Sequence, residues 1–470
     1  MRVNEFHVDL SNLRSDLSIT SRIGFQHESN ADWVNMSIAV IGGGYVGLVL
    51  AAGLAEVGNS VVCAESDSEK RSLLISGISP IYEIGLTDLL SDCINQRTLR
   101  FVANTHDAIE EAQLIFIAVG TPLGPNGSAD LSAVFQVADE IGSALDHDAV
   151  VAVKSTVPVG TCARLEQIIC TSLRNRGADH TCVVISNPEF LKEGDALKDF
   201  RRPDRIVIGS QSEQAVELMR RVYAPFVRNH ERMVIVDRES AELGKYASNA
   251  MLAARISFMN EMSQIAEATG ADIEQVRRVV GSDARIGPDF LYAGPGFGGS
   301  CFSKDIQSLV AAGNQFGVST SLLSSILDVN ERQKTFLFDK LKRKFSSLKG
   351  KRIAVWGLSF KPNTDDVREA ASLVLINELV RHGSHVYAYD PVVHSLGAEV
   401  DSNICICEDK YEALKEADAL VLVTEWKIFR SPDFKKMREV MRGDEILDGR
   451  NIWSRTEVEG AGFNYQGIGK

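Results

Sequence analysis

The strongest constraint on the fold of this chain is a repeated alternation of short apolar runs with helical segments. Between residues 37 and 235 the apolar runs are SIAVI, SVVCA, LIFIAVG, VVAVKS, CVVIS and RIVIG. Because these runs are apolar throughout, they predict strands that are buried on both faces, as in a parallel sheet between two layers of helices. The pattern therefore predicts a doubly wound domain over residues 36–237, with its first strand at Ser37–Ile41.

Residues 238–345 contain no strand-like run. The stretch ESAELGKYASNAMLAARISFMNEMSQIAEATG predicts one long helix that ends near Gly270. At about 1.5 Å per residue this helix spans about 45 Å, so we expect it to link domains and to pack against a partner subunit. Residues 350–470 predict a second β/α domain that starts with IAVWG and includes later strands in ALVLVTEW and EILDGR.

The predicted fold class is thus α/β, with two Rossmann-like doubly wound domains joined by a long central helix and a helical dimerisation segment. Residues 1–35 are polar and irregular, and we expect them to form a disordered extension. The formal net charge of −13 disfavours nucleic acid or an anionic membrane surface as the main partner. No apolar run reaches the ~18 residues of a membrane span and no signal-peptide core is present, so we expect a cytoplasmic protein.

The eight cysteines are spread along the chain without CxxC and without Cys/His pairs at zinc-ligand spacing. They predict reduced thiols and no metal site. None of the nine histidines falls in a motif described here, which argues against a dehydrogenase that uses a histidine as its acid and base.

A glycine-rich turn follows the first predicted strand. Residues 42–47, GGGYVG, satisfy GxGxxG directly before a predicted helix. In that context Gly42 permits the tight turn, Gly44 lets the backbone approach a pyrophosphate, and Gly47 allows close packing of the helix on the sheet. The second strand ends at Glu65, whose carboxylate can bind ribose hydroxyls and would repel a 2′-phosphate, which favours NAD over NADP. Plain turn glycines and a Glu65 that only faces solvent are the alternatives.

Two further strand ends point to the same crevice. Thr121 follows FIAVG, and Thr156 follows VVAVKS. Small hydroxyl residues at the carboxyl ends of parallel strands fit beside a nicotinamide ribose or a reacting oxygen, although ordinary turn chemistry explains each of them as well. Lys70 is a further candidate neighbour of the cofactor, with a solvated lysine as the alternative.

The segment GPDFLYAGPGFGGSCFSKD predicts a flexible, glycine-rich loop that leads into a helix starting at Cys301. The amino end of a helix and the nearby Lys304 both favour a thiolate, so we expect a lowered pKa at Cys301. Asp305, four residues on, lies on the same face. An inert buried cysteine is the alternative.

Two other pairs have helical spacing. Lys245 and Asn249 are four residues apart on the predicted long helix, so they could jointly hold an oxygen or an ordered water, or be a surface pair. In SNPEFLKEGDAL, Asn187 is a candidate helix cap, and Glu189 and Glu193 would share one face of the first turns. Acidic residues there also simply complement the helix dipole.

Together these motifs resemble the UDP-glucose/GDP-mannose dehydrogenase family from Met36 to the end of the chain. The matching segments are VIGGGYVG, FIAVGTPLGPNGSADLSAV, VKSTVPVGT, SNPEFLKEGDALKDFRRPDRIVIG, GKYASNAMLAARISFMNE, ARIGPDFLYAGPGFGGSCFSKD, GLSFKPNTDDVREA and VTEW. The resemblance implies oxidation of a primary alcohol of a nucleotide sugar to a carboxylate, with two NAD and two hydride transfers at one site.

The resemblance also implies roles for individual residues. Cys301 would trap the aldehyde as a thiohemiacetal and then form a thioester. Lys245 and Asn249 would stabilise the oxyanion, and Asp305 would assist proton transfer through an ordered water. Glu189 would help to activate the hydrolytic water. The predicted catalytic residues are therefore Cys301, Lys245, Asn249, Asp305, Glu189 and Thr156.

The remaining predicted contacts follow from the same motifs and the resemblance. The predicted cofactor-binding residues are Gly42, Gly44, Tyr45, Val46, Gly47, Glu65, Lys70, Thr121, Thr156, Glu193, Lys304 and Arg368. The predicted substrate-binding residues are Glu189, Phe190, Leu191, Lys192, Glu193, Lys245, Asn249, Arg285, Phe290, Leu291, Tyr292, Gly294, Gly296, Phe297, Gly298, Phe360 and Lys361.

The GPGFGGSCF and VTEWKIF segments favour UDP-glucose as the substrate and UDP-glucuronate as the product. GDP-mannose, another UDP-hexose, and a protein that senses NAD without turnover are the alternatives. The resemblance implies that Arg285 reaches the sugar nucleotide of a neighbouring subunit, so we expect a homodimer or a larger homo-oligomer. The chain departs from the family pattern at Glu65, Ser303 and Ala370-Ala371, and none of these departures removes a predicted catalytic residue.

Overall fold

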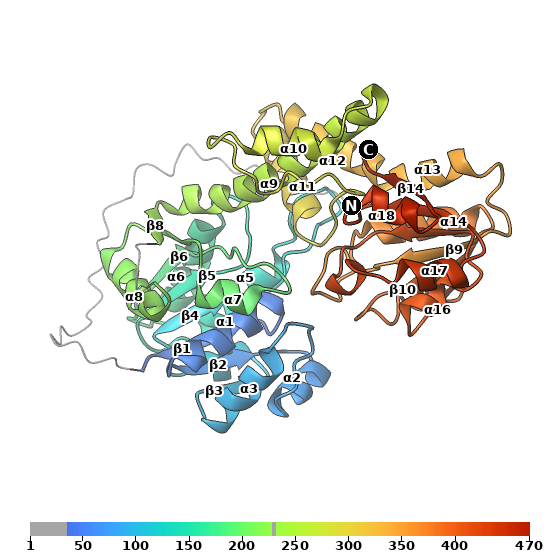
Figure 1. Ribbon diagram of the computed structural model, residues 1–470. Helices are drawn as coiled ribbons and strands as arrows, with labels where there is room; N and C mark the ends of the chain where they lie inside the picture. Colours follow the sequence, from blue (N-terminus) through green and yellow to red (C-terminus); the bar gives the residue numbers. More distant parts are fainter. Residues whose placement is uncertain (1–34, 228–231) are drawn as a thin grey trace, which may run out of the picture.

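The computed structural model describes residues 35–227 and 232–470. Two sheet domains lie on either side of the helices that join them (Figure 1). The extension expected at residues 1–35 lies outside the described residues, apart from Asn35.

The first sheet has the strand order β3-β2-β1-β4-β5-β6-β7-β8. Its strands are β1 Ser37–Ile41, β2 Ser60–Ala64, β3 Leu99–Val102, β4 Leu114–Ile117, β5 Ala149–Val153, β6 Cys182–Ser186, β7 Ile206–Gly209 and β8 Met233–Val236. Neighbouring strands are parallel except for β6 and β7. The strand order reverses between β1 and β4, which is the switch point at which Rossmann folds bind their ligands.

Helices cover both faces of this sheet. They are α1 Tyr45–Glu56, α2 Ser68–Ile75, α3 Leu86–Asn95, α4 Thr105–Ile109, α5 Ser132–Ala144, α6 Thr161–Asn175, α7 Ala196–Arg201, α8 Glu213–Tyr223 and the short 3-10 helix η2 Ala224–Phe226. On β1, Ile38 and Val40 pack into one apolar core, and Ala39 and Ile41 pack into the other. This double burial explains why β1 is apolar at all four of these positions, and it confirms the predicted doubly wound domain.

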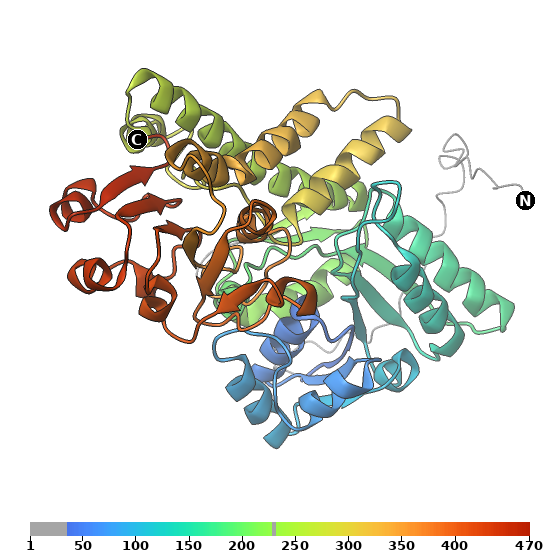
Figure 2. The ribbon, with the colours of Figure 1, turned by 90° about the vertical axis from the view of Figure 1, so that its right-hand side faces the viewer.

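Between the two sheets the described chain forms helices and one long loop, residues 282–301. The helices are α9 Arg238–Thr269, α10 Ile273–Gly281, α11 Phe302–Gln315, α12 Ser321–Lys334 and α13 Phe336–Lys344. Asp237 caps α9 by accepting a hydrogen bond from the Ser240 amide at 2.7 Å, and the helix ends at Gly270, whose φ of 78° is left-handed. The predicted long helix is confirmed. Figure 2 shows α11 and α12 as a pair of helices that packs on α9.

The second sheet has the order β11-β10-β9-β12-β13-β14, and its neighbouring strands are all parallel. Its strands are β9 Arg352–Trp356, β10 His385–Tyr389, β11 Ile404–Ile406, β12 Ala419–Leu422, β13 Glu445–Asp448 and β14 Asn464–Gly467. Its helices are α14 Ala371–Arg381, α15 Ala398–Asp401, α16 Lys410–Leu414, η3 Lys427–Phe429, α17 Phe434–Val440 and α18 Arg455–Gly460. The predicted second Rossmann-like domain is thus confirmed. Over the described ranges, no helix combines the length and the apolar character needed to span a bilayer.

The second domain closes the turn after its first strand with an internal carboxylate. Asp390 follows β10 just as Glu65 follows β2, and it is 1% exposed. Its Oδ2 accepts hydrogen bonds from the amides of Leu358 at 2.7 Å and Ser359 at 3.1 Å, and from Trp426 Nε1 at 3.0 Å. The amide donors of this turn are therefore satisfied within the chain.

We predict that Asp390→Ala lowers the free energy of unfolding by about 3 kcal/mol, because it leaves several buried N–H donors without an acceptor. Urea unfolding followed by tryptophan fluorescence measures the change. Asp339→Ala, which alters an exposed carboxylate on α13, is the matched control and is expected to cost less than about 0.5 kcal/mol. Equal stability of the two variants would contradict the role given to Asp390.

Candidate functional site

The glycine turn after β1 has the geometry of a pyrophosphate site. Gly42 has a φ of 112°, and a Cβ there would lie 2.7 Å from the Ala118 carbonyl oxygen. A Cβ on Gly47 would lie 1.8 Å from the Gly42 carbonyl oxygen, so glycine is required at both positions. No atom lies within 4 Å of the Cβ position of Gly44, and no side chain caps α1. The amides at the start of α1, from Tyr45 and Val46 onward, can therefore face an anion.

Glu65 lies beside this turn. It is buried, and its Oε1 accepts a hydrogen bond from the Asp67 amide at 2.8 Å. A Cβ on Gly43 would lie 2.8 Å from Glu65 Oε2, so the carboxylate faces the glycine turn and the solvent-facing alternative is wrong. Lys70 is exposed, and its amide donates to Asp67 Oδ1 in the cap of α2. Sequence reasoning missed Arg71, whose guanidinium donates to the Glu65 carbonyl at 2.7 Å.

Hydrogen bonds connect the segments that follow β4 and β5. The Thr121 hydroxyl donates to the Thr156 carbonyl at 2.9 Å. The Ser155 hydroxyl donates to the Val119 carbonyl at 2.6 Å. Both predicted hydroxyl residues therefore lie at the carboxyl edge of the sheet, where its ligands are expected.

Two polar pairs bring the predicted catalytic residues together. Lys245 and Asn249 are 4% and 7% exposed, so the surface-pair alternative is wrong. Lys245 Nζ forms an ion pair with Glu189 Oε1 at 3.2 Å, and Asn249 Nδ2 donates to Asp305 Oδ2 at 2.6 Å. Asp305 is 1% exposed, and its amide donates to the Cys301 carbonyl at 2.9 Å. The cysteine thus begins α11 next to an acid, an amide and a buried ion pair.

The pKa of Cys301 is raised, which corrects the sequence prediction. Although the residue is exposed, protein atoms around its sulfur raise the pKa by desolvation, and the negative charges of Glu189 and Asp305 raise it further. Lys245 opposes this rise. Lys304, which was expected to favour a thiolate, forms an ion pair with Asp305 Oδ1 at 2.7 Å instead. Desolvation and the two carboxylates therefore outweigh Lys245, and the pKa of Cys301 lies above the ordinary value of a cysteine thiol.

The loop before Cys301 is tightly packed, so the prediction of a flexible loop is wrong. Residues 293–299 are all buried. A Cβ on Gly298 would lie 2.6 Å from the Glu369 carbonyl oxygen, and one on Gly299 would lie 2.9 Å from the Phe360 ring. The Gly299 amide donates to the Arg368 carbonyl at 2.8 Å. These glycines let the loop approach the second domain closely.

Three buried amide side chains that sequence reasoning missed hold this loop in place. Asn260 Oδ1 accepts from the Gly294 amide at 2.9 Å, and Gln333 Nε2 donates to the Gly294 carbonyl at 2.8 Å. Asn330 Oδ1 accepts from the Phe297 amide at 2.8 Å, close to Gly296. Asn260 follows Asn249 by about three turns of α9, so a polar residue on the same helical face was the available signal.

The segment between β6 and α7 is not helical, which corrects a second prediction. Asn187 does not cap a helix, because its Nδ2 donates to the Val207 carbonyl at 2.8 Å and its Oδ1 accepts from the Tyr223 hydroxyl at 2.9 Å. Glu189 and Glu193 consequently have different partners. Glu189 faces Lys245, and Glu193 lies 3.8 Å from the Arg368 guanidinium of the second domain.

The other residues of this segment have contacts of their own. Lys245 Nζ lies 5.0 Å from the centroid of the Phe190 ring, and the guanidinium carbon of Arg205 lies 3.9 Å from the same centroid. The Leu191 amide donates to Glu189 Oε2 at 2.6 Å. Lys192 forms an ion pair with Asp199 at 2.9 Å.

Charged residues meet at the boundary between the two domains. Burial and the nearby Asp366 carboxylate raise the pKa of Glu193 to about 7, against the opposing charges of Arg368 and Lys361. Arg368 also forms an ion pair with Asp366 at 2.7 Å. Lys361 is half-buried, and desolvation lowers its pKa. These positive charges could face an anionic ligand between the domains.

Tyr45 connects the glycine turn to a neighbouring loop of the first domain, and Arg450 lies within the second domain. The Tyr45 hydroxyl binds Glu83 and accepts a hydrogen bond from the Gly194 amide at 2.6 Å, which ties the glycine turn to the 187–194 segment. Arg450, which sequence reasoning missed, follows β13 and donates to the Phe360 carbonyl at 3.4 Å. Its position as the last residue of the predicted strand segment EILDGR was the available signal.

The structure does not bring Arg285 into this site. Its guanidinium is exposed and forms an ion pair with Asp283 at 2.6 Å. Phe290 has a positive φ of 60°, Leu291 is buried, and Tyr292 is exposed with the Arg277 guanidinium 4.5 Å from its ring centroid. These residues form the outer part of the loop.

Comparison with known proteins covers nearly all of the described chain. The NAD binding, central and UDP binding domains of the UDP-glucose/GDP-mannose dehydrogenase family match residues 36–227, 239–332 and 354–455. A UDP-glucose 6-dehydrogenase of Pseudomonas aeruginosa is 50% identical over 93% of this chain and 98% of its own length. One from Rhizobium meliloti is 42% identical over 93% of this chain and all of its own length.

A solved structure agrees with these matches. The UDP-glucose dehydrogenase from Pyrobaculum islandicum is 34% identical, covers 94% of this chain and 100% of its own, and superposes with a TM-score of 0.85. The chain therefore belongs to the UDP-glucose/GDP-mannose dehydrogenase family.

Proposed function

We propose that this chain oxidises UDP-glucose to UDP-glucuronate with two molecules of NAD, through a covalent intermediate on Cys301. The observation that carries the proposal is the buried group around that cysteine, in which Asn249 binds Asp305 and Lys245 pairs with Glu189. The group lies between the glycine turn of the first domain and the cations of the second. Curated relatives at 50%, 41% and 42% identity are named UDP-glucose 6-dehydrogenases.

The first domain fits NAD. The uncapped start of α1 and the open space over Gly44 fit a pyrophosphate, and the Glu65 carboxylate beside Gly43 fits ribose hydroxyls. NAD supplies the hydride acceptor for each oxidation. Thr121 and Thr156 lie where the nicotinamide end would extend along the sheet edge.

In the first oxidation, the primary alcohol loses a proton and a hydride and becomes an aldehyde. A water held by Asn249 and Asp305 takes the proton, and the Lys245 ammonium stabilises the developing oxyanion. The Cys301 sulfur then adds to the aldehyde carbon, forming a C–S bond and a thiohemiacetal. This step also transfers a proton from the thiol to the aldehyde oxygen, which becomes the hydroxyl of the thiohemiacetal, since the pKa of Cys301 is raised.

In the second oxidation, the thiohemiacetal carbon loses a hydride and the oxygen loses its proton, which gives a thioester. Water then attacks the thioester carbon, the C–S bond breaks, and the acid and the free thiol result. Glu189 lies beside Lys245 and would orient and deprotonate this water. In total, one water is consumed and two NAD are reduced.

The second domain would hold the nucleotide sugar. Lys361 and Arg450 lie at the carboxyl edge of its sheet together with Phe360, on the side that faces the cysteine loop. Two cations and an aromatic ring suit a diphosphate joined to a base. A cytoplasmic location is also part of the proposal, since the eight cysteines, all in the described residues, are unpaired.

We predict that the purified protein releases two NADH for each UDP-glucose consumed, and that NADP supports little turnover because Glu65 would repel its 2′-phosphate. Absorbance at the NADH band with UDP-glucose, UDP-galactose and GDP-mannose, measured side by side, tests both points. Activity confined to GDP-mannose would assign the chain to the other substrate class of the family. Binding of NAD without turnover of any of these sugars would identify a sensor.

Cys301→Ser should lower acid formation by about 1,000-fold or more while NAD binding changes little, because serine lacks the nucleophilic sulfur of the thioester. Mass spectrometry of the product and a fluorescence titration with NAD measure the two effects. Cys405→Ser, at an exposed thiol of the second domain, is the matched control and should retain activity. Full acid production by the Cys301 variant would rule out the covalent route.

We also infer a homodimer that forms along α9. Leu243, Met251, Phe258 and Ile265 are exposed apolar residues of this helix, and their spacing of seven or eight residues places them on one face. An exposed apolar stripe of this kind is typical of an interface. Arg285, whose side chain is exposed, would then be free to reach the neighbouring copy.

The double variant Met251→Glu/Phe258→Glu should be monomeric, because two charges in the apolar stripe would have to be buried on association. Size-exclusion chromatography with light scattering gives the mass in solution. Val57→Glu places the same charge at an exposed apolar position outside α9 and should leave the oligomer unchanged. A monomeric wild-type chain, or a double variant with wild-type mass, would refute the interface.

A further inference from the structure

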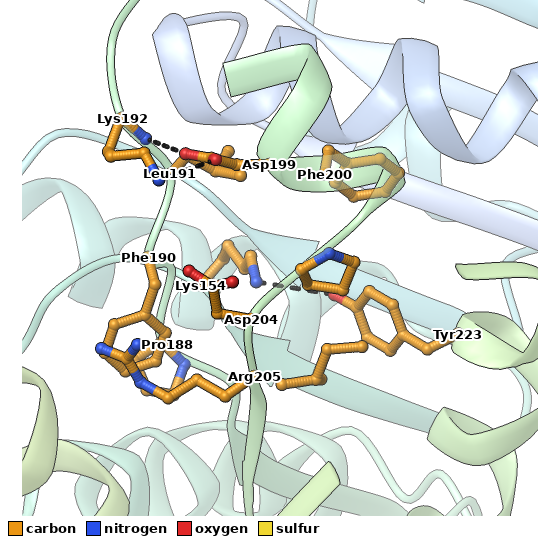
Figure 3. A pocket seen from close by; sticks show the side chains of 12 residues that line it. Lys154, Pro188, Phe190, Leu191, Lys192, Asp199, Phe200, Asp204, Arg205 and Tyr223 are labelled. Atoms are coloured by element: carbon orange, nitrogen blue, oxygen red, sulfur yellow. Dashed lines mark hydrogen bonds and ion pairs between the residues drawn. The ribbon is translucent and has the colours of Figure 1, made fainter. Parts of the chain in front are cut away.

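Lys154 is a buried lysine that the proposed reaction does not use. It lies against the segment that carries Glu189. Lys154 directly follows β5 and lines a cavity of about 50 Å³ together with Pro188, Phe190, Arg205 and other residues (Figure 3). It is 7% exposed. The cavity lies on the 187–191 segment, which carries Glu189 at its centre.

The hydrogen-bond partners of this lysine are neutral. Lys154 Nζ donates to Asn187 Oδ1 at 3.3 Å and to the Tyr223 hydroxyl at 3.5 Å, and Figure 3 shows the second of these contacts. Among the described residues, no carboxylate lies within ion-pair distance of Nζ. A buried ammonium without a paired carboxylate is costly, so a more distant charge has to compensate it.

The compensating charge is that of the Glu189 carboxylate. Glu189 attracts the Lys154 ammonium, and Lys245 repels it. The two carboxylates that line the same cavity have other partners: Asp199 binds Lys192, and Asp204 acts on Arg205.

Hydrogen bonds of Asn187 connect Lys154 to the segment that carries Glu189. The Asn187 amide donates to the Val153 carbonyl at 2.9 Å, and its side chain binds Val207, Tyr223 and Lys154. Since Glu189 is only two residues further along, these bonds fix the start of the segment that carries it.

We propose that Lys154 is a positioning residue for thioester hydrolysis, which acts through its positive charge and through Asn187 by holding the segment that carries Glu189 in place, without touching the substrate. This inference rests on the role given to Glu189 in the proposed function. The groups that face Glu189 are Lys245 from α9, Cys301 at the start of α11 and Lys154 from β5. Lys154 is therefore a second buried cation whose charge attracts Glu189, although the two groups are too far apart to form an ion pair.

The ionisation of Lys154 gives this proposal a pH signature. Burial lowers the pKa of Lys154 to about 8, and Glu189 limits that fall. The ammonium is therefore present below about pH 8 and is lost as the pH rises through that value. Because the Glu189 charge raises the pKa of Lys154, removal of that charge would lower the pKa of Lys154 further.

The first experiment compares Lys154→Met with Tyr223→Phe in the full chain. We expect the Met variant to lose about ten-fold in kcat at pH 7, with KM for UDP-glucose and NAD within about two-fold of wild type, and to lack the inflection of kcat near pH 8. Tyr223→Phe removes a hydrogen-bond partner but keeps the charge, so it should retain the inflection. If Lys154→Met is not folded by circular dichroism, Lys154→Gln takes its place.

The second experiment needs no substrate. Carbon-13 NMR of the lysine Cε carbons, with the Lys154 signal assigned by its absence from the Met or Gln variant, follows the titration of Lys154 directly. Glu189→Gln should move this titration to lower pH, because the attracting charge is gone. Asp204→Asn, which neutralises a carboxylate of the same cavity, should leave it in place.

Several results would overturn the proposal. A Lys154 variant with wild-type kcat and an intact inflection near pH 8 would overturn it. Equal changes in kcat and in its pH profile for Lys154→Met and Tyr223→Phe would overturn it as well. An unchanged Lys154 titration in Glu189→Gln would remove the coupling itself. A wild-type chain that does not oxidise UDP-glucose would instead count against the proposed function, and the NMR comparison would still decide the link between Lys154 and Glu189.

Discussion

The hydrogen bond between Asn249 and Asp305 is the contact on which the site depends. At 2.6 Å and fully buried, it joins the central helix α9 to the first turn of α11, and so it fixes Cys301 beside Lys245. The ion pair between Lys245 and Glu189 extends this connection to the first sheet domain. The packing of Gly298 and Gly299 extends it to the second domain. Three separate parts of the chain therefore meet at one sulfur atom.

Features that depend on local patterns could be predicted from the sequence. Apolar runs indicated the strands of both sheets, and the absence of such runs indicated the helical middle of the chain. The glycines after β1 have the conformation and close contacts that their spacing predicts. The helical spacing of Lys245 and Asn249 correctly placed both on one face, because that relation needs nothing beyond the helix itself.

Features that depend on distant partners could not be predicted in this way. The pKa of Cys301 rises because Glu189, 112 positions earlier in the chain, and Asp305 both face the sulfur while Lys304 turns to Asp305. The 187–194 segment is not helical because Asn187 is held by β7 and α8. The glycines of the cysteine loop are needed for close packing, and a sequence cannot distinguish that need from flexibility. The long-range contacts decided each of these outcomes.

The carboxylate of Asp390 distinguishes the second domain from the first, although the first six strands of each domain follow the same order. This carboxylate accepts hydrogen bonds from amides of the turn after β9, so these amides have an acceptor within the chain and are not free to bind the phosphates of a dinucleotide. In the proposed reaction, the second domain would keep the half-oxidised sugar bound by its nucleotide while one nicotinamide replaces another on the first domain. The two sheet domains would then bind different ligands, and one catalytic cycle would use two cofactors without releasing the aldehyde.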